Sequence, residues 1–282
     1  MTLRVRAASP AASASTGGSY ADALRAAVGF ARKTITITEL EARRLRHDPT
    51  ELITRALQPA LWLLVFGQVF TRTRAIPTGD LPYIDFMAPG ILAQSVLFIA
   101  IFYGIAVIWE RDLGIIHKFL VSPTPRAALV LGKGLSAALR GLTQGVIVYA
   151  LAWLLGVHLN WHPLALVGVL GTVVLSAVLF ATFSLAIACL VKTRERFMGI
   201  GQILTMPLFF ASNAIYPIAL MPRWLQIISH MNPLTYEVDA LRALMLARGA
   251  SVSGLGLDFA VLIATAAGLI AVTSRLYPRV VT

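Results

Sequence analysis

Long apolar runs separated by short polar segments dominate the chain after residue 50. Each run has about 20 residues or more, which is enough to cross the hydrocarbon core of a bilayer as a helix. A helix satisfies its backbone polar groups internally, so such runs are stable in lipid. The pattern predicts an all-α integral membrane protein with six transmembrane helices. The runs are residues 52–70, 86–109, 127–155, 164–191, 198–220 and 256–276, and the fifth is interrupted by Pro207 and Pro217.

A charged segment with a helical pattern, residues 110–133, lies between the second and third runs. Its apolar residues recur at helical spacing, its basic residues lie on another side, and two prolines then end the helix. The pattern predicts a short amphipathic helix at the lipid surface, able to receive force from a soluble partner. An ordinary charged loop is the alternative. The apolar residues are Leu113, Ile116 and Leu120, the basic residues are Arg111 and Lys118, and the prolines are Pro123 and Pro125.

Two segments precede the first run. Residues 1–20 are rich in Ala, Ser and Gly and contain no apolar stretch typical of a signal peptide, so they predict a disordered tail. Residues 21–47 are basic, with apolar residues at helical spacing, and predict an interfacial helix that contacts membrane lipid on the cytoplasmic leaflet. A solvated basic helix is the alternative. Residues 48–282 are expected to form the transmembrane domain.

Two short helical patterns lie between the fifth and sixth runs. The first begins at Pro222 and the second follows Asn232. Each is too short to cross a bilayer but apolar enough to enter it, which predicts a re-entrant helical hairpin on the outer side. An amphipathic surface loop is the alternative. Glu237 and Asp239 either line an outer vestibule or cap a surface helix toward water, and we favour the second interpretation.

Composition and charge support this assignment. Of the residues, 57% are hydrophobic and 13% charged, whereas a soluble domain has about 25% charged residues. With the N-terminus inside, 18 of the 24 Lys and Arg residues fall in cytoplasmic segments and 5 in outer ones. This bias predicts that both termini are cytoplasmic. The net charge of +11 therefore reflects lipid-adjacent basic residues rather than nucleic-acid binding, and the abundance of Arg and Ala indicates a bacterial plasma membrane.

The sequence contains no pattern for ATP binding or catalysis. The pair Gly132–Lys133 is followed by Gly134 instead of Ser or Thr, so no P-loop is formed and no cofactor is expected. His158 and His162 lie four residues apart, but a short outer turn explains them better than a metal site. No Ser, His and Asp pattern occurs, and acidic residues are scarce within the runs, which argues against a membrane enzyme.

Three residues of the third run, one arginine and two glycines, bear on how this helix is placed in the membrane and against other helices. Arg140 is expected to snorkel to the interface, with the bundle interior as the alternative. Gly141 and Gly145 allow close helix contact, which is weak support for a dimer face.

Four segments together resemble the permease subunits of type-2 ABC exporters, most of all the daunorubicin-resistance group. They are residues 43–70, 110–133, 212–226 and 232–245, roughly half the chain. The resemblance implies a separately encoded ATP-binding ABC subunit and a second permease copy or a homologous permease. It also implies a coupling helix at 110–121 and an extracellular gate in the hairpin. The coupling residues would be Glu110, Arg111, Asp112, Leu113, Ile116 and Lys118, and Tyr216, Asn232 and Glu237 would belong to the substrate pathway or outer gate. Phe209, Phe210 and Asn213 are our candidates for lining that pathway: a polar amide such as Asn213 should face protein, water or ligand rather than lipid, whereas simple helix packing is the alternative for the two Phe residues.

The expected function is export of a lipophilic drug or lipid-like compound by the membrane-spanning subunit of an ATP-driven ABC exporter. Export of a polysaccharide or lipid-linked glycan is an alternative, although no dense aromatic stripe is present. A membrane-embedded lipid-modifying enzyme would need clustered acids or histidines in its spans. A secondary transporter would show internal repeats and buried ionisable groups.

Overall fold

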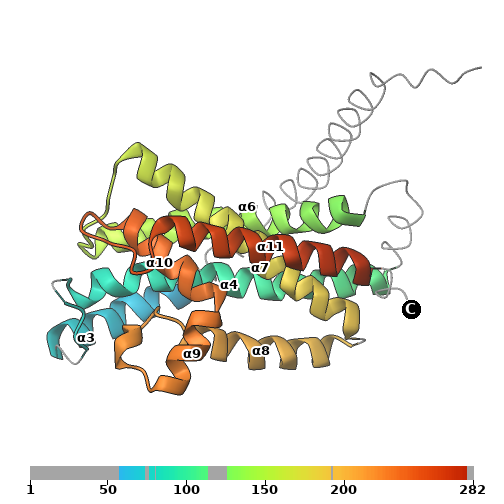
Figure 1. Cartoon of the computed structure of the whole chain (residues 1–282), viewed down its shortest axis with the longest axis horizontal. Coiled ribbons are helices and arrows are strands. Elements are labelled where there is room, and N and C mark those ends of the chain that lie inside the picture. The colour runs from blue at the N-terminus through green and yellow to red at the C-terminus, as the bar shows by residue number, and fades with distance from the viewer. Residues whose placement is uncertain (1–56, 74–75, 80, 114–125, 192, 278–282) are drawn as a thin grey trace, which may run out of the picture.

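The structure, a computed structural model, describes residues 57–73, 76–79, 81–113, 126–191 and 193–277. Most of these residues are helical, and four of the described helices are long and apolar enough to cross a membrane. In Figure 1 they run along the long axis of the molecule, and α7 packs against the other three. The four helices are α4 (Tyr83–Asp112), α6 (Arg126–Leu154), α7 (Pro163–Leu190) and α11 (Leu255–Leu276).

These four helices confirm the second, third, fourth and sixth predicted runs to within one helical turn. The helix of the first run is described from Leu57 and contains a π-helical stretch, η1 (Trp62–Gly67), followed by α3 (Gln68–Thr73). The ring of Phe70 contacts that of Tyr83 in α4 with centroids 5.3 Å apart, so the C-terminal end of α3 and the N-terminal end of α4 lie together.

The fifth run is shorter than the sequence predicts. Helix α8 (Arg194–Phe210) ends three residues after Pro207, and turns followed by the 3-10 helix η2 (Ile218–Leu220) replace the predicted last turns. Pro207 lacks a backbone donor within the last turn of α8. The helix therefore ends beside Pro207, the first of the two prolines at which the sequence predicts an interruption of this run.

The two short helices predicted between the fifth and sixth runs are present as α9 (Arg223–Met231) and α10 (Pro233–Met245). Helix α10 packs against α4, α7 and α11, and both short helices lie at the end of the molecule opposite the C-terminus (Figure 1). Glu237 and Asp239 are consequently buried, at 0% and 1% exposure. The expectation that they face water was wrong, because α10 is enclosed by three longer helices.

The small residues and the arginine of the third run face their own bundle. A Cβ at Gly141 would contact Ala177 of α7, and one at Gly145 would contact Leu92 of α4. The glycine pair thus serves packing within the chain. Arg140 is half-buried, with its guanidinium 5.4 Å from the ring centre of the buried Tyr103. This places Arg140 toward α4, the alternative to snorkelling.

The predicted N-terminal tail and interfacial helix lie outside the described residues. The same holds for residues 114–125, which include Ile116 and Lys118.

Candidate functional site

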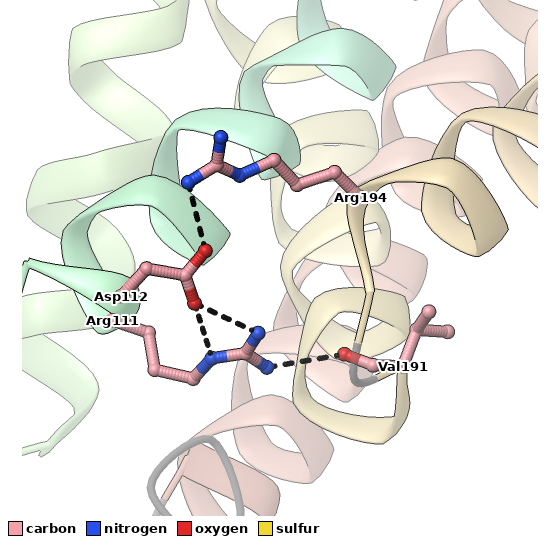
Figure 2. A network of polar contacts seen from close by, with 4 residues as sticks. All are labelled: Arg111, Asp112, Val191 and Arg194. Atoms are coloured by element: carbon pink, nitrogen blue, oxygen red, sulfur yellow. Dashed lines mark hydrogen bonds and ion pairs between the residues drawn. The ribbon is translucent and has the colours of Figure 1, made fainter.

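The predicted coupling segment begins within α4 itself. Arg111 and Asp112 form the last turn of α4, and Arg194 opens α8. The Asp112 carboxylate accepts hydrogen bonds from Nη2 of Arg111 at 3.1 Å and from Nη2 of Arg194 at 2.8 Å. Arg111 also donates to the carbonyl of Val191 at 3.4 Å. Figure 2 shows the two guanidinium groups approaching Asp112 from different sides, so this network ties the end of α4 to the turn between α7 and α8.

A tryptophan and a leucine extend this network toward solvent. The Arg194 guanidinium stacks over the ring of Trp109, 3.6 Å from its centre. Trp109 remains 49% exposed and Leu113 69% exposed. Arg and Trp side chains that are held in place yet accessible are the residue types that dominate protein–protein contacts. We call this surface the inner patch: Trp109, Arg111, Asp112, Leu113 and Arg194.

Glu110, which was also predicted to contact the ATPase, has a different position. Its carboxylate accepts two hydrogen bonds from Nζ of Lys133 in α6, at 2.6 and 2.7 Å. The two residues are 7% and 6% exposed. The pair joins α4 to α6 next to the inner patch in sequence. Glu110 is therefore buried beneath the inner patch instead of forming part of its surface.

Four residues of the predicted outer gate come together at the end of α8. The rings of Phe209 and Phe210 lie 5.4 Å apart, and the hydroxyl of Tyr216 donates to the Phe210 carbonyl. Asn232, the N-cap of α10, donates from Nδ2 to the carbonyl of Leu208 at 2.6 Å. Phe209 is buried whereas Phe210 is exposed. The turn between α9 and α10 is thereby fixed to the last turn of α8.

Asn213 is buried in the turn that follows α8. Its backbone carbonyl accepts a hydrogen bond from Nη2 of Arg242 in α10 at 2.8 Å. Arg242 also donates to the Phe86 carbonyl at 3.4 Å and lies 3.9 Å from the centre of the Phe86 ring. Non-helical backbone is tolerated at membrane depth when protein groups satisfy it. Arg242 performs this task for the broken end of the fifth run, and it joins α10, α4 and the turn.

The same turn is pressed against α4. A Cβ at Gly90 would lie 2.4 Å from the carbonyl oxygen of Ala214, so only glycine allows this approach. The Tyr83 hydroxyl adds a hydrogen bond to the carbonyl of Ile215 at 3.1 Å. The N-terminal half of α4 is therefore in direct contact with the backbone of the predicted gate.

Glu237 is separate from these contacts. It is fully buried on α10, beside Ser176 of α7. It belongs to the packed interior of the described bundle, whereas the other five predicted gate residues surround the end of α8.

Sequence reasoning missed several residues of these networks. Arg194 and Arg242 were considered only as charges that set orientation, and Lys133 was considered besides only as part of a possible ATP-binding motif. Arg242 could have been found from its position in the sequence. It lies within an apolar helical pattern, where burying a charged side chain costs free energy. His158 and Asp85 form another missed pair, with Nδ1 and Oδ2 at 2.9 Å, between the loop after α6 and the start of α4.

Comparisons with known proteins agree with the family suggested by the sequence motifs. A family model described as ABC-2 type transporter matches residues 32–246. The putative transport permease ycf38 of Cyanophora paradoxa is 30% identical over 71% of this chain and 70% of its own length. The daunorubicin resistance ABC transporter permease protein DrrB1 of Streptomyces coeruleorubidus is 28% identical over 82% of this chain and 81% of its own. The inner membrane transport permease YadH of Escherichia coli K12 is 27% identical, over 75% and 81%.

Proposed function

This chain belongs to the ABC-2 type transporter family, and on that basis we propose that it exports a lipophilic drug or a lipid-like compound, driven by a separately encoded ATPase subunit. It is a membrane subunit of a transporter rather than an enzyme. The observation that carries the proposal is the match to the family over residues 32–246. The similarity to a daunorubicin-resistance permease, aligned over 82% of this chain, supports it.

The inner patch is the proposed contact for the ATPase, together with residues 114–121, which the structure does not describe. The Asp112–Arg194 bond and the Trp109–Arg194 stack support this role, because they hold an accessible, mixed-charge surface at the ends of two long helices. Force applied to this surface reaches α4 and α8 together. The Glu110–Lys133 pair passes it on to α6.

Helix α4 is the proposed connection between the ATPase and the outer gate. It runs from Tyr83 and Phe86, beside the turn that follows α8, to Asp112 in the inner patch. A rigid 30-residue helix in contact with both regions couples their positions mechanically. In alternating access, ATP-dependent closure of the ATPase dimer would shift this helix and change the affinity for substrate between the two states.

We further propose six membrane crossings, with both termini in the cytoplasm of a bacterium and α9 and α10 as a re-entrant hairpin on the outer side. The helix from Leu57 and helix α8 would supply the two crossings beyond the four long helices. Residues 21–47 would lie on the cytoplasmic leaflet. Cysteines introduced at Arg223 and Arg248 should react with an impermeant maleimide added outside; labelling only from the cytoplasm would overturn this topology.

A second permease, identical or homologous, is the proposed partner within the membrane. Helix α8 supports this, because it packs mainly against α4 and leaves Ile203, Met206 and Phe210 exposed on its other side. A substrate path at this face would include Phe210 and the gate residues around it.

The decisive experiment is reconstitution of the chain with the P-loop ATPase expected in a neighbouring reading frame. Inside-out vesicles should accumulate daunorubicin only when both subunits and ATP are present, and a hydrolysis-deficient ATPase should abolish uptake. Uptake by the permease alone, without a nucleotide-hydrolysing partner, would contradict the proposal.

A further inference from the structure

A cavity of about 360 Å³ lies among α4, α6 and the helix described from Leu57 onward. Ser95 and Phe98 line it near the middle of the 30-residue helix α4, which places the cavity close to the centre of the membrane-spanning region. It is separate from the residues predicted to form the substrate path. Its volume lies within the range of about 300–1,000 Å³ that is typical of small-molecule sites.

The cavity is lined by polar groups that are unusual at this depth. Gln58 and Gln144 contribute side-chain amides, and Gln144 is only 2% exposed. Ser95 donates its hydroxyl proton to the carbonyl of Ile91 at 2.8 Å, which leaves its oxygen able to accept. Uncharged polar groups inside a bilayer are costly unless they contact protein, water or a ligand.

The remaining wall is aromatic and apolar. The rings of Phe98 and Phe102 lie one helical turn apart, with centroids separated by 6.1 Å. The described lining contains no charged side chain. The cavity therefore combines hydrogen-bonding groups with an aromatic and apolar surface.

A local irregularity of the backbone accompanies the cavity. Pro59 lines it, and the π-helical stretch η1 follows within the same helix. Short π-helical stretches within α-helices occur often at functional sites, because they widen one turn and redirect side chains. Here the stretch begins four residues after Gln58.

We propose that this cavity binds a neutral amphiphile, whose hydroxyl, carbonyl or amide group bonds to Gln58 and Gln144 while its alkyl or aromatic body lies on Phe98 and Phe102. Amides can both donate and accept, so they match such uncharged groups. A charged headgroup finds no counter-charge in the described lining and would lose its hydration on entry. The inference stands on the cavity and does not depend on export.

The test is photolabelling of the full-length protein in lipid nanodiscs, without ATPase or nucleotide. The probe is a monoacylglycerol that carries a diazirine in its acyl chain, and labelled peptides are mapped by mass spectrometry. Labelling should saturate and lie on the peptide that contains Phe98 and Phe102. Gln58→Leu and Gln144→Leu should each weaken the apparent affinity about five- to tenfold, the effect of losing one hydrogen bond.

The matched control is Gln202→Leu, because Gln202 is an exposed amide in α8, outside the cavity. It should leave the affinity unchanged. A diazirine fatty acid, compared at about pH 9.5 so that its carboxyl is ionised in the nanodisc, should label the same peptide at least fivefold more weakly than the neutral probe. Circular dichroism and gel filtration identify folded variants; since Gln58 is exposed, its variant provides the result even if Gln144→Leu does not fold.

Three outcomes would overturn the inference. The first is labelling that neither cavity variant weakens, which would indicate ordinary lipid contact. The second is an equal loss in the Gln202→Leu control. The third is a fatty-acid probe that labels as strongly as the neutral probe, which would assign a different ligand class.

Discussion

Breaking the Glu110–Lys133 ion pair should destabilise the protein far more than removing both of its members. Glu110→Gln leaves the Lys133 ammonium buried without its carboxylate, and Lys133→Met leaves the carboxylate buried without its ammonium. The double variant removes both charges and keeps similar side-chain volumes. The pair is suited to this comparison because both residues are less than 10% exposed and contact each other through two hydrogen bonds.

The magnitude follows from the geometry. At 2.7 Å, two unit charges attract by about 6 kcal/mol for an effective dielectric constant of about 20. Desolvation of each ion costs several kcal/mol, so the intact pair contributes little compared with two apolar side chains. Removing one partner leaves the desolvation cost without the attraction. We expect each single variant to lose about 3–5 kcal/mol and the double variant to lose less than either single variant.

The assay is equilibrium unfolding of the purified protein in mixed micelles with increasing SDS, monitored by tryptophan fluorescence. Asp112→Asn is the matched control, because Asp112 is a neighbouring carboxylate with an exposed side chain and should change the free energy of unfolding by less than about 1 kcal/mol. If the double variant loses as much as the two single variants added together, the residues are not coupled and the reasoning is refuted.

Three further predictions concern the inner patch and the outer gate. Arg194→Glu should place like charges at Asp112 and weaken ATPase association at least tenfold in pull-down titrations, whereas Arg194→Lys should retain most of it; equal binding by both would contradict the proposed contact. Arg242→Met should abolish transport while ATPase binding persists, because the Asn213 carbonyl loses its donor; unchanged transport would remove Arg242 from the gate. Gly90→Ala should lower stability by about 1–3 kcal/mol in the SDS assay through contact with Ala214, and an unaffected variant would mean that the turn can move away.

Much of the architecture could be predicted from local sequence. The second, third, fourth and sixth runs became helices with nearly the predicted ends, because length and apolarity determine a membrane-crossing helix without reference to its neighbours. The short helices α9 and α10 were predicted from Pro222 and the Asn232–Pro233 pair, since capping residues act within a single turn.

The candidate sites could be predicted only in part. Tyr216 and Asn232 were chosen from the family-like segments and Phe209 and Phe210 as aromatic candidates for lining a substrate path, and the structure brings all four together at the end of α8. Sequence reasoning could not find Arg194 as the partner of Asp112, because 82 positions separate them along the chain. It also assigned Glu237 and Asp239 to water, since a short helix with acidic residues has the same pattern on a surface as in a bundle.

Local sequence was sufficient to establish that the chain enters a membrane, where its long helices begin and end, and which family it resembles. These properties depend on hydrophobicity, capping and motif order, all of which are local along the chain. Contacts in three dimensions settle which charges neutralise each other, which groups satisfy the broken end of the fifth run, and which helices enclose α10. Those outcomes depend on contacts between residues that are distant in sequence, such as Arg242 with Asn213 and Glu110 with Lys133, and packing energy is set by that proximity in space.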